Sequence, residues 1–242
     1  MRYLCIDTSN GASVSIVDFD GQSMQVLSDK KMDNPRMHGE KLAVLLSEVL
    51  LELGADNIAE ANIDRVVCGT GPAPFTGLRA GLVTARVAAF TAGVPLLGIC
   101  SLDVLALQGF DFAIEHELFG LDETAKGKPA VFVATDARRK EIYSGLYIAN
   151  GENDVKAFDD VSVDLPESVS SRFDKYGELD IVNVGQGAYK YSGHFALNEL
   201  APLYVESKNM ARIAYLREIN GIDMTSSEPM YLRRPDVQEP NK

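Results

Sequence analysis

Residues 2–28 read RYLCIDTSNGASVSIVDFDGQSMQVLS, and this stretch decides the fold. Residues 2–7 are mostly apolar and predict a strand that ends at a polar, glycine-containing turn. Residues 12–18 alternate small or polar with apolar side chains, which is the period of a half-buried strand. Asp20-Gly21 is a hairpin signal that leads into a third strand over 23–28. The stretch therefore predicts three successive antiparallel strands.

The remainder of the chain predicts further helices and strands after these three strands, and then a second copy of the same order of elements. In the first half the expected elements are a helix over 38–53, a strand over 63–69, a helix over 76–92, a strand over 95–99 and a helix over 101–108. In the second half they are strands over 130–136, 140–148 and 153–163, a short helix over 166–173, a strand over 180–184 and a helix over 207–219. Residues 109–128 have no clear period, so we place the junction between the halves there.

Three antiparallel strands followed by helix, strand and helix, twice over, resemble the ground plan of the actin-like ATPase (ASKHA) superfamily. We therefore expect an α/β protein with two RNase H-like lobes, each a mixed sheet with flanking helices. The lobes are expected at 1–108 and 109–242, with the last helix packing back on the first lobe. In this plan a nucleotide lies between the lobes, against the turn that follows the first strand of each.

The amino-acid composition limits the classes of protein to which this chain can belong. The chain has 242 residues, 46% hydrophobic and 24% charged, and a formal net charge of −12. These shares are typical of a globular protein and exclude a coiled coil or a fibre. The negative charge disfavours tight, independent binding of nucleic acid. The cysteines Cys5, Cys68 and Cys100 lie in apolar runs, which favours a reducing compartment. Because residues 1–7 are too short for a signal peptide and Gly93 and Pro95 interrupt the longest apolar region, we expect a cytoplasmic protein without a membrane span.

The two turns that would hold a nucleotide differ in chemistry. The first contains Asp7, Thr8 and Ser9 and resembles a phosphate hairpin, although the pattern alone favours a turn that satisfies its own backbone. The corresponding second turn contains Asp136, Arg138 and Arg139 but no glycine, so large side chains block close approach of a phosphate. Together they predict a degenerate nucleotide cleft rather than a competent ATP site.

Catalytic and metal-binding patterns are weak. The histidines His38, His116 and His194 are far apart in sequence, and no pair has the i, i+4 spacing of a helical metal site. No Gly-x-Ser-x-Gly elbow anchors a nucleophile. We therefore expect no metal, no cofactor and no catalytic residue.

The loop 69–77 and the helix after it are the most distinctive run. Glycines and prolines fix an irregular backbone, which serves either to hold an anion at the helix N-terminus or as a rigid connector capped by Thr76. Over 77–92 the only charges are Arg79 and Arg86, seven residues apart and so on one face. A helix that is apolar nearly all round must be buried on more than one side.

The helix over 38–53 has surplus apolar surface as well. Leu42, Leu45 and their helical neighbours form a core stripe, while a second apolar seam recurs every seven residues on the opposite side. Beside the apolar helix over 76–92, this seam predicts a partner interface. Its candidate residues are Met37, His38, Lys41, Val44, Glu48, Leu51, Gly81, Leu82, Ala85 and Ala89.

Several of these runs together resemble one family. They are Asp7-Thr8-Ser9, His38-Gly39-Glu40-Lys41-Leu42, Gly71-Pro72-Ala73-Pro74-Phe75-Thr76-Gly77-Leu78-Arg79, Gly98-Ile99-Cys100-Ser101-Leu102, Asp136-Ala137-Arg138-Arg139-Lys140-Glu141-Ile142-Tyr143 and Pro229-Met230-Tyr231-Leu232-Arg233-Arg234-Pro235. In this order they resemble the TsaB (YeaZ) family of bacterial proteins that act in forming threonylcarbamoyladenosine in tRNA.

The resemblance implies a non-catalytic scaffold subunit of a tRNA threonylcarbamoyltransferase complex. It implies that the helices over 38–53 and 76–92 bind and stabilise a catalytic TsaD-like paralogue or, in a homodimer, a second copy. It further implies that a TsaE-like ATPase joins the complex and that tRNA is bound only through the complex. The alternative is an ATP-dependent enzyme, kinase- or peptidase-like, on the same fold, for which Asp7 and its turn are the local support.

Overall fold

A computed structural model describes residues 1–32, 38–119, 127–173, 175, 178–196 and 198–233, with only the backbone of residues 38–40, 170 and 173. The first lobe is built on a five-stranded sheet in the order β3-β2-β1-β4-β5. β1 (Arg2–Asp7), β2 (Ala12–Phe19) and β3 (Met24–Met32) are antiparallel, which confirms the prediction from the opening stretch. β4 (Arg65–Gly69) and β5 (Leu96–Ile99) continue the sheet in parallel with β1. β3 continues four residues past its predicted end, because its polar residues hydrogen-bond to β2 at the sheet edge.

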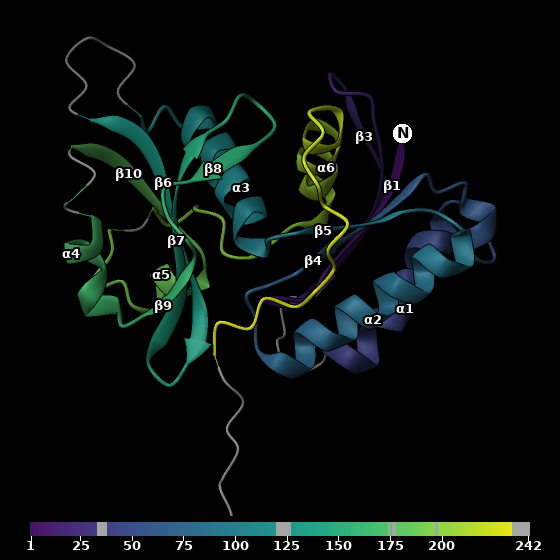
Figure 1. Ribbon diagram of the computed structural model, residues 1–242, viewed down its shortest axis with the longest axis horizontal. Helices are drawn as coiled ribbons and strands as arrows, with labels where there is room; N and C mark the ends of the chain where they lie inside the picture. The colour runs from purple at the N-terminus through teal and green to yellow at the C-terminus, as the bar shows by residue number, and fades with distance from the viewer. Residues whose placement is uncertain (33–37, 120–126, 174, 176–177, 197, 234–242) are drawn as a thin grey trace, which may run out of the picture.

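Two helices cover one face of this sheet. α1 (His38–Glu52) packs on β2 and β3, α2 (Phe75–Ala92) packs on β4, and the two helices also contact each other (Figure 1). Alternate strand residues such as Leu4 and Ile16 meet the apolar stripe of α1, including Leu42 and Val49, in one buried cluster. The stripe predicted from helical spacing is therefore the core of the first lobe.

The second lobe repeats the strand plan. β6 (Lys128–Arg138) and β7 (Glu141–Ala149) form an antiparallel hairpin, and β10 (Leu179–Val184) is parallel to β6. The order β10-β6-β7-β8 corresponds to β4-β1-β2-β3 of the first lobe. The single strand predicted over 153–163 is wrong: two short strands, β8 (Val155–Ala157) and β9 (Ser162–Asp164), pair with different parts of β7.

α3 (Ser101–Glu115) and α6 (Met210–Ile219) lie between the two sheets (Figure 1). Their side chains join one buried cluster with residues of both lobes, such as Tyr3 and Val131. The predicted end of α3 at residue 108 is wrong. Gly109 does not break the helix, because it lets α3 approach the second sheet closely: a Cβ there would lie 2.7 Å from Val131.

A buried ion-pair network fixes α6. Arg217 pairs at 2.8 Å with Asp103 of α3 and at 2.8 Å with Asp154 beside β8. Burial raises the pKa of Asp103 above its ordinary value even though the Arg217 guanidinium opposes this shift. Removing one partner of a buried pair leaves an uncompensated charge, so this network ties α6 to both lobes.

These lobes form the α/β, actin-like ATPase architecture that the sequence predicts. Short helices complete the second lobe, namely α4 (Val169–Phe173) and α5 (Gln186–Lys190), with 3-10 turns at Pro166–Ser168 and Ser207–Asn209. A further 3-10 turn, Ile58–Ala61, lies in the first lobe between α1 and β4. α5 has no counterpart among the predicted elements. Within the described ranges, every helix is too short or too polar to cross a lipid bilayer.

Candidate functional site

The turn after β1 is closed by its own side chains. Asp7 is 3% exposed. One of its carboxylate oxygens accepts hydrogen bonds from the Ser9 amide at 2.8 Å and the Ser9 hydroxyl at 2.6 Å. The other accepts from the Ser101 hydroxyl at the start of α3, also at 2.6 Å. Asp7 therefore joins the first strand to α3 and uses both of its oxygens within the chain.

Glycines bring α2 and β4 close to this turn. A Cβ at Gly69 would lie 1.9 Å from the Asp7 carboxylate, and a Cβ at Gly81 would lie 2.2 Å from the Thr8 hydroxyl. The Thr8 hydroxyl instead donates to the Gly77 carbonyl at 2.9 Å. The small residues of α2 thus serve packing inside the chain.

The space left beside Asp7 is small. The cavity bordered by Asp7, Asn10 and Lys31 has a volume of about 10 Å³, which is room for one water molecule and not for a nucleotide. The buried Asn10 side-chain amide has no hydrogen-bond partner there. In the part of the chain that the structure describes, no three His, Cys, Asp or Glu side chains converge as metal ligands would.

The turn between β6 and β7 is open. Arg138, Arg139 and Lys140 are all exposed, and all three have left-handed φ angles of 67°, 53° and 67°. Asp136 pairs with Lys190 of α5 at 3.0 Å and accepts from the Arg138 amide at 3.1 Å. The second turn therefore presents cations to solvent where the first buries a carboxylate.

The outer surface of α1 and α2 carries exposed apolar side chains. Val44 and Leu51 of α1 are 46% and 67% exposed, and Val83, Val87 and Phe90 of α2 are 58%, 58% and 90% exposed. We call these five residues the apolar helical face. Large apolar side chains that gather on one surface mark an interaction site more often than isolated ones do.

The structure corrects four of the ten predicted interface residues. Gly81, Leu82, Ala85 and Ala89 are buried against the first sheet and α1, so they belong to the core. Lys41 is half-buried and Glu48 is exposed beside the apolar helical face. Met37 lies outside the described residues, and so does the side chain of His38.

The exposed α2 residues were missed although the sequence holds a signal for them. Arg79 and Arg86 mark the solvent side of α2, and Val83, Val87 and Phe90 follow at helical steps of three and four from them. The small residues of this helix suggested a partner interface, whereas its two arginines indicate the exposed side. Charge marks the outer side of a helix more directly, because buried small residues pack equally well within one chain.

Residues 222–233, which we call the C-terminal strap, run from α6 along β5 and down between the lobes (Figure 1). The Gly98 amide donates to the Met224 carbonyl, and the Met230 amide donates to the Thr70 carbonyl, both at 2.8 Å. Farther along, Arg233 pairs with Glu141 and donates to the Ala137 carbonyl at 3.0 Å. The strap therefore joins the first lobe to the β6–β7 hairpin.

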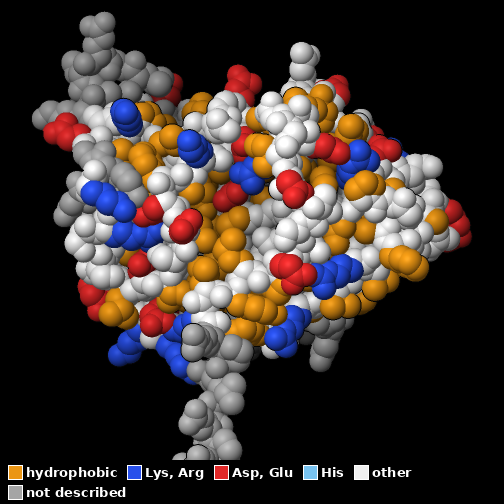
Figure 2. Space-filling model, in the orientation of Figure 1, with side chains coloured by type: hydrophobic (Ala, Val, Ile, Leu, Met, Phe, Trp, Pro, Cys, Tyr) orange, Lys and Arg blue, Asp and Glu red, His pale blue; other side chains and the backbone are white. Residues whose placement is uncertain are grey.

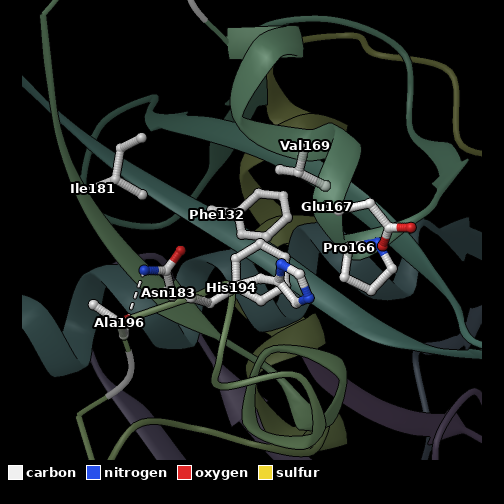
Figure 3. Close-up of a pocket in the computed structure, with 9 residues that line it drawn as sticks. Phe132, Pro166, Glu167, Val169, Ile181, Asn183, His194 and Ala196 are labelled. Carbon is white, nitrogen blue, oxygen red and sulfur yellow. Dashed lines mark hydrogen bonds between the residues drawn. The ribbon is translucent and has the colours of Figure 1, made fainter.

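A separate pocket of about 210 Å³ lies on the outer side of the second sheet (Figure 3). The rings of Phe132 and Phe195 meet there with centroids 5.2 Å apart, while the Asn183 amide donates to the Ala196 carbonyl at 2.7 Å. His194, which lies far from the other histidines in the sequence, is exposed at this pocket. The volume lies below the usual range of ligand pockets, about 300–1,000 Å³.

The cysteines are poor nucleophiles in this fold. Burial, with a smaller contribution from the nearby Asp7 carboxylate, raises the pKa of the Cys68 thiol to about 12. Burial likewise raises the pKa of Cys5 and of Cys100. The thiolate is the reactive form of cysteine, so these residues act as small core side chains.

Comparison with known sequences identifies relatives over nearly the whole chain. Residues 32–192 match the family model described as TsaD, tRNA N6-adenosine threonylcarbamoyltransferase. An uncharacterized Mycobacterium tuberculosis protein is 30% identical over 97% of this chain and 93% of its own length. Escherichia coli tRNA threonylcarbamoyladenosine biosynthesis protein TsaB is 27% identical, covering 96% of this chain and 95% of that protein.

A longer protein and a solved structure are also similar to this chain. The chain spans only 55% of an uncharacterized Mycobacterium leprae protein, to which it is 29% identical. YeaZ from Pseudomonas aeruginosa has a solved structure that superposes with a TM-score of 0.70 at 21% identity, covering 95% of this chain and all of the other. The superposition supports a shared fold.

Proposed function

This chain belongs to the TsaD family, in which it is a TsaB-like protein, and from that premise we propose that it acts in forming threonylcarbamoyladenosine in tRNA as a non-catalytic scaffold. In this role it binds and stabilises a TsaD-like catalytic paralogue, which modifies the adenosine beside the anticodon. A TsaE-like ATPase joins the complex, and tRNA is bound through the assembly. The names of the relatives support a role in this pathway, and the exposed residues of this chain support the scaffold role.

The observation that carries the scaffold role is the apolar helical face. Leu51 and Phe90 are large side chains that are 67% and 90% exposed in the single chain. Burying such a side chain in a partner stabilises a complex by roughly 1.5–3 kcal/mol, so a few of them suffice as interface hot spots. The same face serves in a homodimer when the paralogue is absent, so a second copy and the paralogue compete for it when both are present.

The closed turn at Asp7 supports a non-catalytic reading. Both oxygens of Asp7 accept hydrogen bonds from Ser9 and Ser101, and the adjoining cavity has room for about one water molecule. An enzyme that used ATP here would need an open carboxylate for a metal or a water and backbone amides accessible to phosphates. The alternative, an ATP-dependent kinase- or peptidase-like enzyme, predicts micromolar ATP binding by the isolated chain.

Light scattering after size-exclusion chromatography tests the scaffold role. The wild-type chain should form a one-to-one complex with the TsaD-like protein of the same organism, replacing any homodimer. Leu51→Asp and Phe90→Asp should each abolish that complex while circular dichroism stays unchanged. Ile114→Asp is the matched control, because Ile114 is 70% exposed on α3 and lies outside the apolar helical face.

Two results would contradict the proposal. Assembly of Leu51→Asp and Phe90→Asp at wild-type strength would remove the apolar helical face as the interface. Calorimetric binding of ATP to the isolated chain, lost in Asp7→Ala, would support the enzyme instead.

A further inference from the structure

Cations gather at the lower edge of the second lobe, although the chain as a whole has a net charge of −12. Arg138 and Lys140 stand exposed at the tip of the β6–β7 hairpin. Lys190 of α5 and Arg233 of the C-terminal strap lie beside the same hairpin. Figure 2 shows basic side chains along this edge of the molecule.

Three segments that are far apart in the sequence bring these charges together. Asp136 holds Lys190 at 3.0 Å and the Arg138 guanidinium at 3.9 Å, while Glu141 pairs with Arg233. Like charges repel, and an acidic protein has ample surface on which to separate them. Their concentration at one edge creates a local positive potential that attracts a polyanion.

The backbone at the hairpin tip keeps large cations where glycine fits best. Arg138, Arg139 and Lys140 are consecutive and all have φ between 53° and 67°. Residues other than glycine populate this left-handed region sparsely. Strained backbone conformations of this kind cluster at functional sites.

An aromatic cluster lies directly beside the cations. The ring of Phe75, at the start of α2, and the ring of Tyr231 in the strap have centroids 4.7 Å apart. The Arg79 guanidinium lies 5.8 Å from the first centroid and 5.6 Å from the second, and Arg79 donates to the Tyr231 hydroxyl at 2.8 Å. Two residues of extended chain span about 7 Å, so Tyr231 places this cluster next to Arg233 and the hairpin.

We propose that this basic–aromatic edge, made of Phe75, Arg79, Arg138, Lys140, Tyr231 and Arg233, contacts a single-stranded RNA loop. The cations meet backbone phosphates, and Tyr231, which is 39% exposed, stacks with an unpaired base. Flexible RNA loops are recognised by this combination of Arg, Lys and aromatic side chains. The inference rests on the proposed function, under which the RNA is the tRNA held by the complex.

The net charge explains why the edge acts only within an assembly. The other surfaces of the chain repel phosphates, so the edge adds contacts to an RNA that the partner already holds. An acidic protein would also be attracted to the cations. The paired rings favour RNA, because every base has a flat face that stacks on an aromatic side chain.

The test measures the salt dependence of tRNA binding by the assembled complex. The full chain is mixed with the TsaD-like protein, complex formation is verified by light scattering, and fluorescently labelled tRNA is titrated at several salt concentrations. The double variant Arg138→Glu/Lys140→Glu should assemble normally but bind tRNA about tenfold or more weakly, with a log–log salt slope shallower by about two. Lys128→Glu/Lys156→Glu is the matched control, because both lysines are exposed at other places on the second sheet.

Tyr231→Ala provides an independent measurement. Loss of one stacked base should weaken tRNA binding roughly fivefold to a hundredfold while the salt slope stays unchanged, because no charge is removed. Thermal unfolding of this variant shows whether the strap remains in place. A loss of affinity with an unchanged melting temperature supports stacking, and unchanged affinity overturns it.

The remaining outcomes separate the two proposals. If the complex forms and the charge variant binds tRNA like its control, the RNA contact is wrong and the scaffold role stands. If the charge variant fails to assemble, the edge binds protein and the RNA contact is wrong. If the wild-type proteins do not associate, the proposed function fails and the RNA contact falls with it.

Discussion

The turn after β1 and the turn after β6 occupy the same place in two copies of one strand plan, yet they have opposite chemistry. The first turns inward, with Asp7 3% exposed and both of its oxygens occupied by Ser9 and Ser101. The second turns outward, with Arg138 and its two successors exposed in left-handed conformations. Turns that follow equivalent strands therefore belong to the buried core in one lobe and to the exposed surface in the other.

The difference follows from what packs on each turn. Gly69 and Gly81 let β4 and α2 close over the first turn. The second turn contains large cationic side chains, which cannot be buried without their counter-charges. Substitutions at the first turn should therefore change stability much more than equivalent substitutions at the second.

The largest effect is expected at Gly69. Gly69→Ala places a methyl group 1.9 Å from the Asp7 carboxylate and 2.7 Å from the Ser101 hydroxyl. We expect overpacking at this buried strand to lower the free energy of unfolding by about 3 kcal/mol. Urea denaturation measures this loss. Gly193→Ala is the control, because no atom lies within 4 Å of its added Cβ.

The carboxylates of the two turns, Asp7 and Asp136, should contribute differently to the free energy of unfolding. Asp7→Ala leaves the Ser9 and Ser101 donors without their acceptor and should lower stability by about 2–3 kcal/mol. Asp136→Ala breaks a pair in which the Asp136 side chain is 10% exposed but the Lys190 side chain is 45% exposed. Because water can solvate the Lys190 ammonium once the carboxylate is gone, the loss should be only about 1 kcal/mol. Equal losses in denaturation curves would contradict the distinction between a buried and a surface turn.

Glycine substitutions should have opposite signs at the two turns. Gly11 has φ of 137°, and Gly11→Ala should lower stability by about 1 kcal/mol because a Cβ is strained there. Arg139 has φ of 53° without being glycine, and Arg139→Gly should raise stability by up to about 1 kcal/mol. The shift of the melting temperature measures both effects. A lower melting temperature for Arg139→Gly would show that its side chain stabilises the hairpin.

The smallest effect expected is in the pH dependence. Burial raises the pKa of Glu206, but Lys31 and Lys208 outweigh it, so the net pKa lies below the ordinary 4.5. The stabilisation is present above that ordinary value and is lost as the pH falls through the lowered folded pKa. Lys31 borders the first-turn cavity, and Lys31→Met should flatten the acid limb of the stability curve by a few tenths of a kcal/mol.

The second turn should respond at the opposite end of the pH scale. Burial lowers the pKa of Lys190, but Asp136 outweighs it, so the net pKa lies above the ordinary 10.5. The stabilisation is present below that value and is lost as the pH rises through the raised folded pKa. Stability curves of Asp136→Asn and wild type should therefore differ at neutral pH and converge in strong alkali. Convergence near neutral pH would contradict the pairing with Lys190.

Local patterns predicted most of the strands and helices. The alternation over residues 12–18 and the stripe through Leu42 and Val49 were sufficient to place both elements. The expectation of a half-buried strand over 12–18 is wrong, because β2 is buried on both faces and the Ser13 and Ser15 hydroxyls of its polar face hydrogen-bond to the Ser207 hydroxyl. Gly109 shows the limit of such patterns. Its helix-breaking tendency indicated an end to α3, but close packing on the second sheet outweighs that tendency, and the sequence around Gly109 does not contain that contact.

The candidate site was less predictable for the same reason. The exposed side of α1 followed from helical spacing, as Val44 and Leu51 show. For α2 the small residues were assigned to a partner, whereas Gly81 contacts Thr8, which is 73 positions earlier in the sequence. The proline-flanked run near Tyr231 was recognised only as a family resemblance, since nothing local predicts its contact with Arg79.

The C-terminal strap and α6 have a consequence for synthesis on the ribosome. α6 covers one face of the first sheet, and the strap completes the surroundings of Thr70 and Arg79, so the first lobe requires residues near 210–233. A nascent chain that ends at residue 204 should leave the apolar face around Tyr3 and Leu97 uncovered and be cut readily by protease. The apolar helical face is complete much earlier, so during translation the proposed partner surface forms before the core on the opposite face of the first sheet has closed.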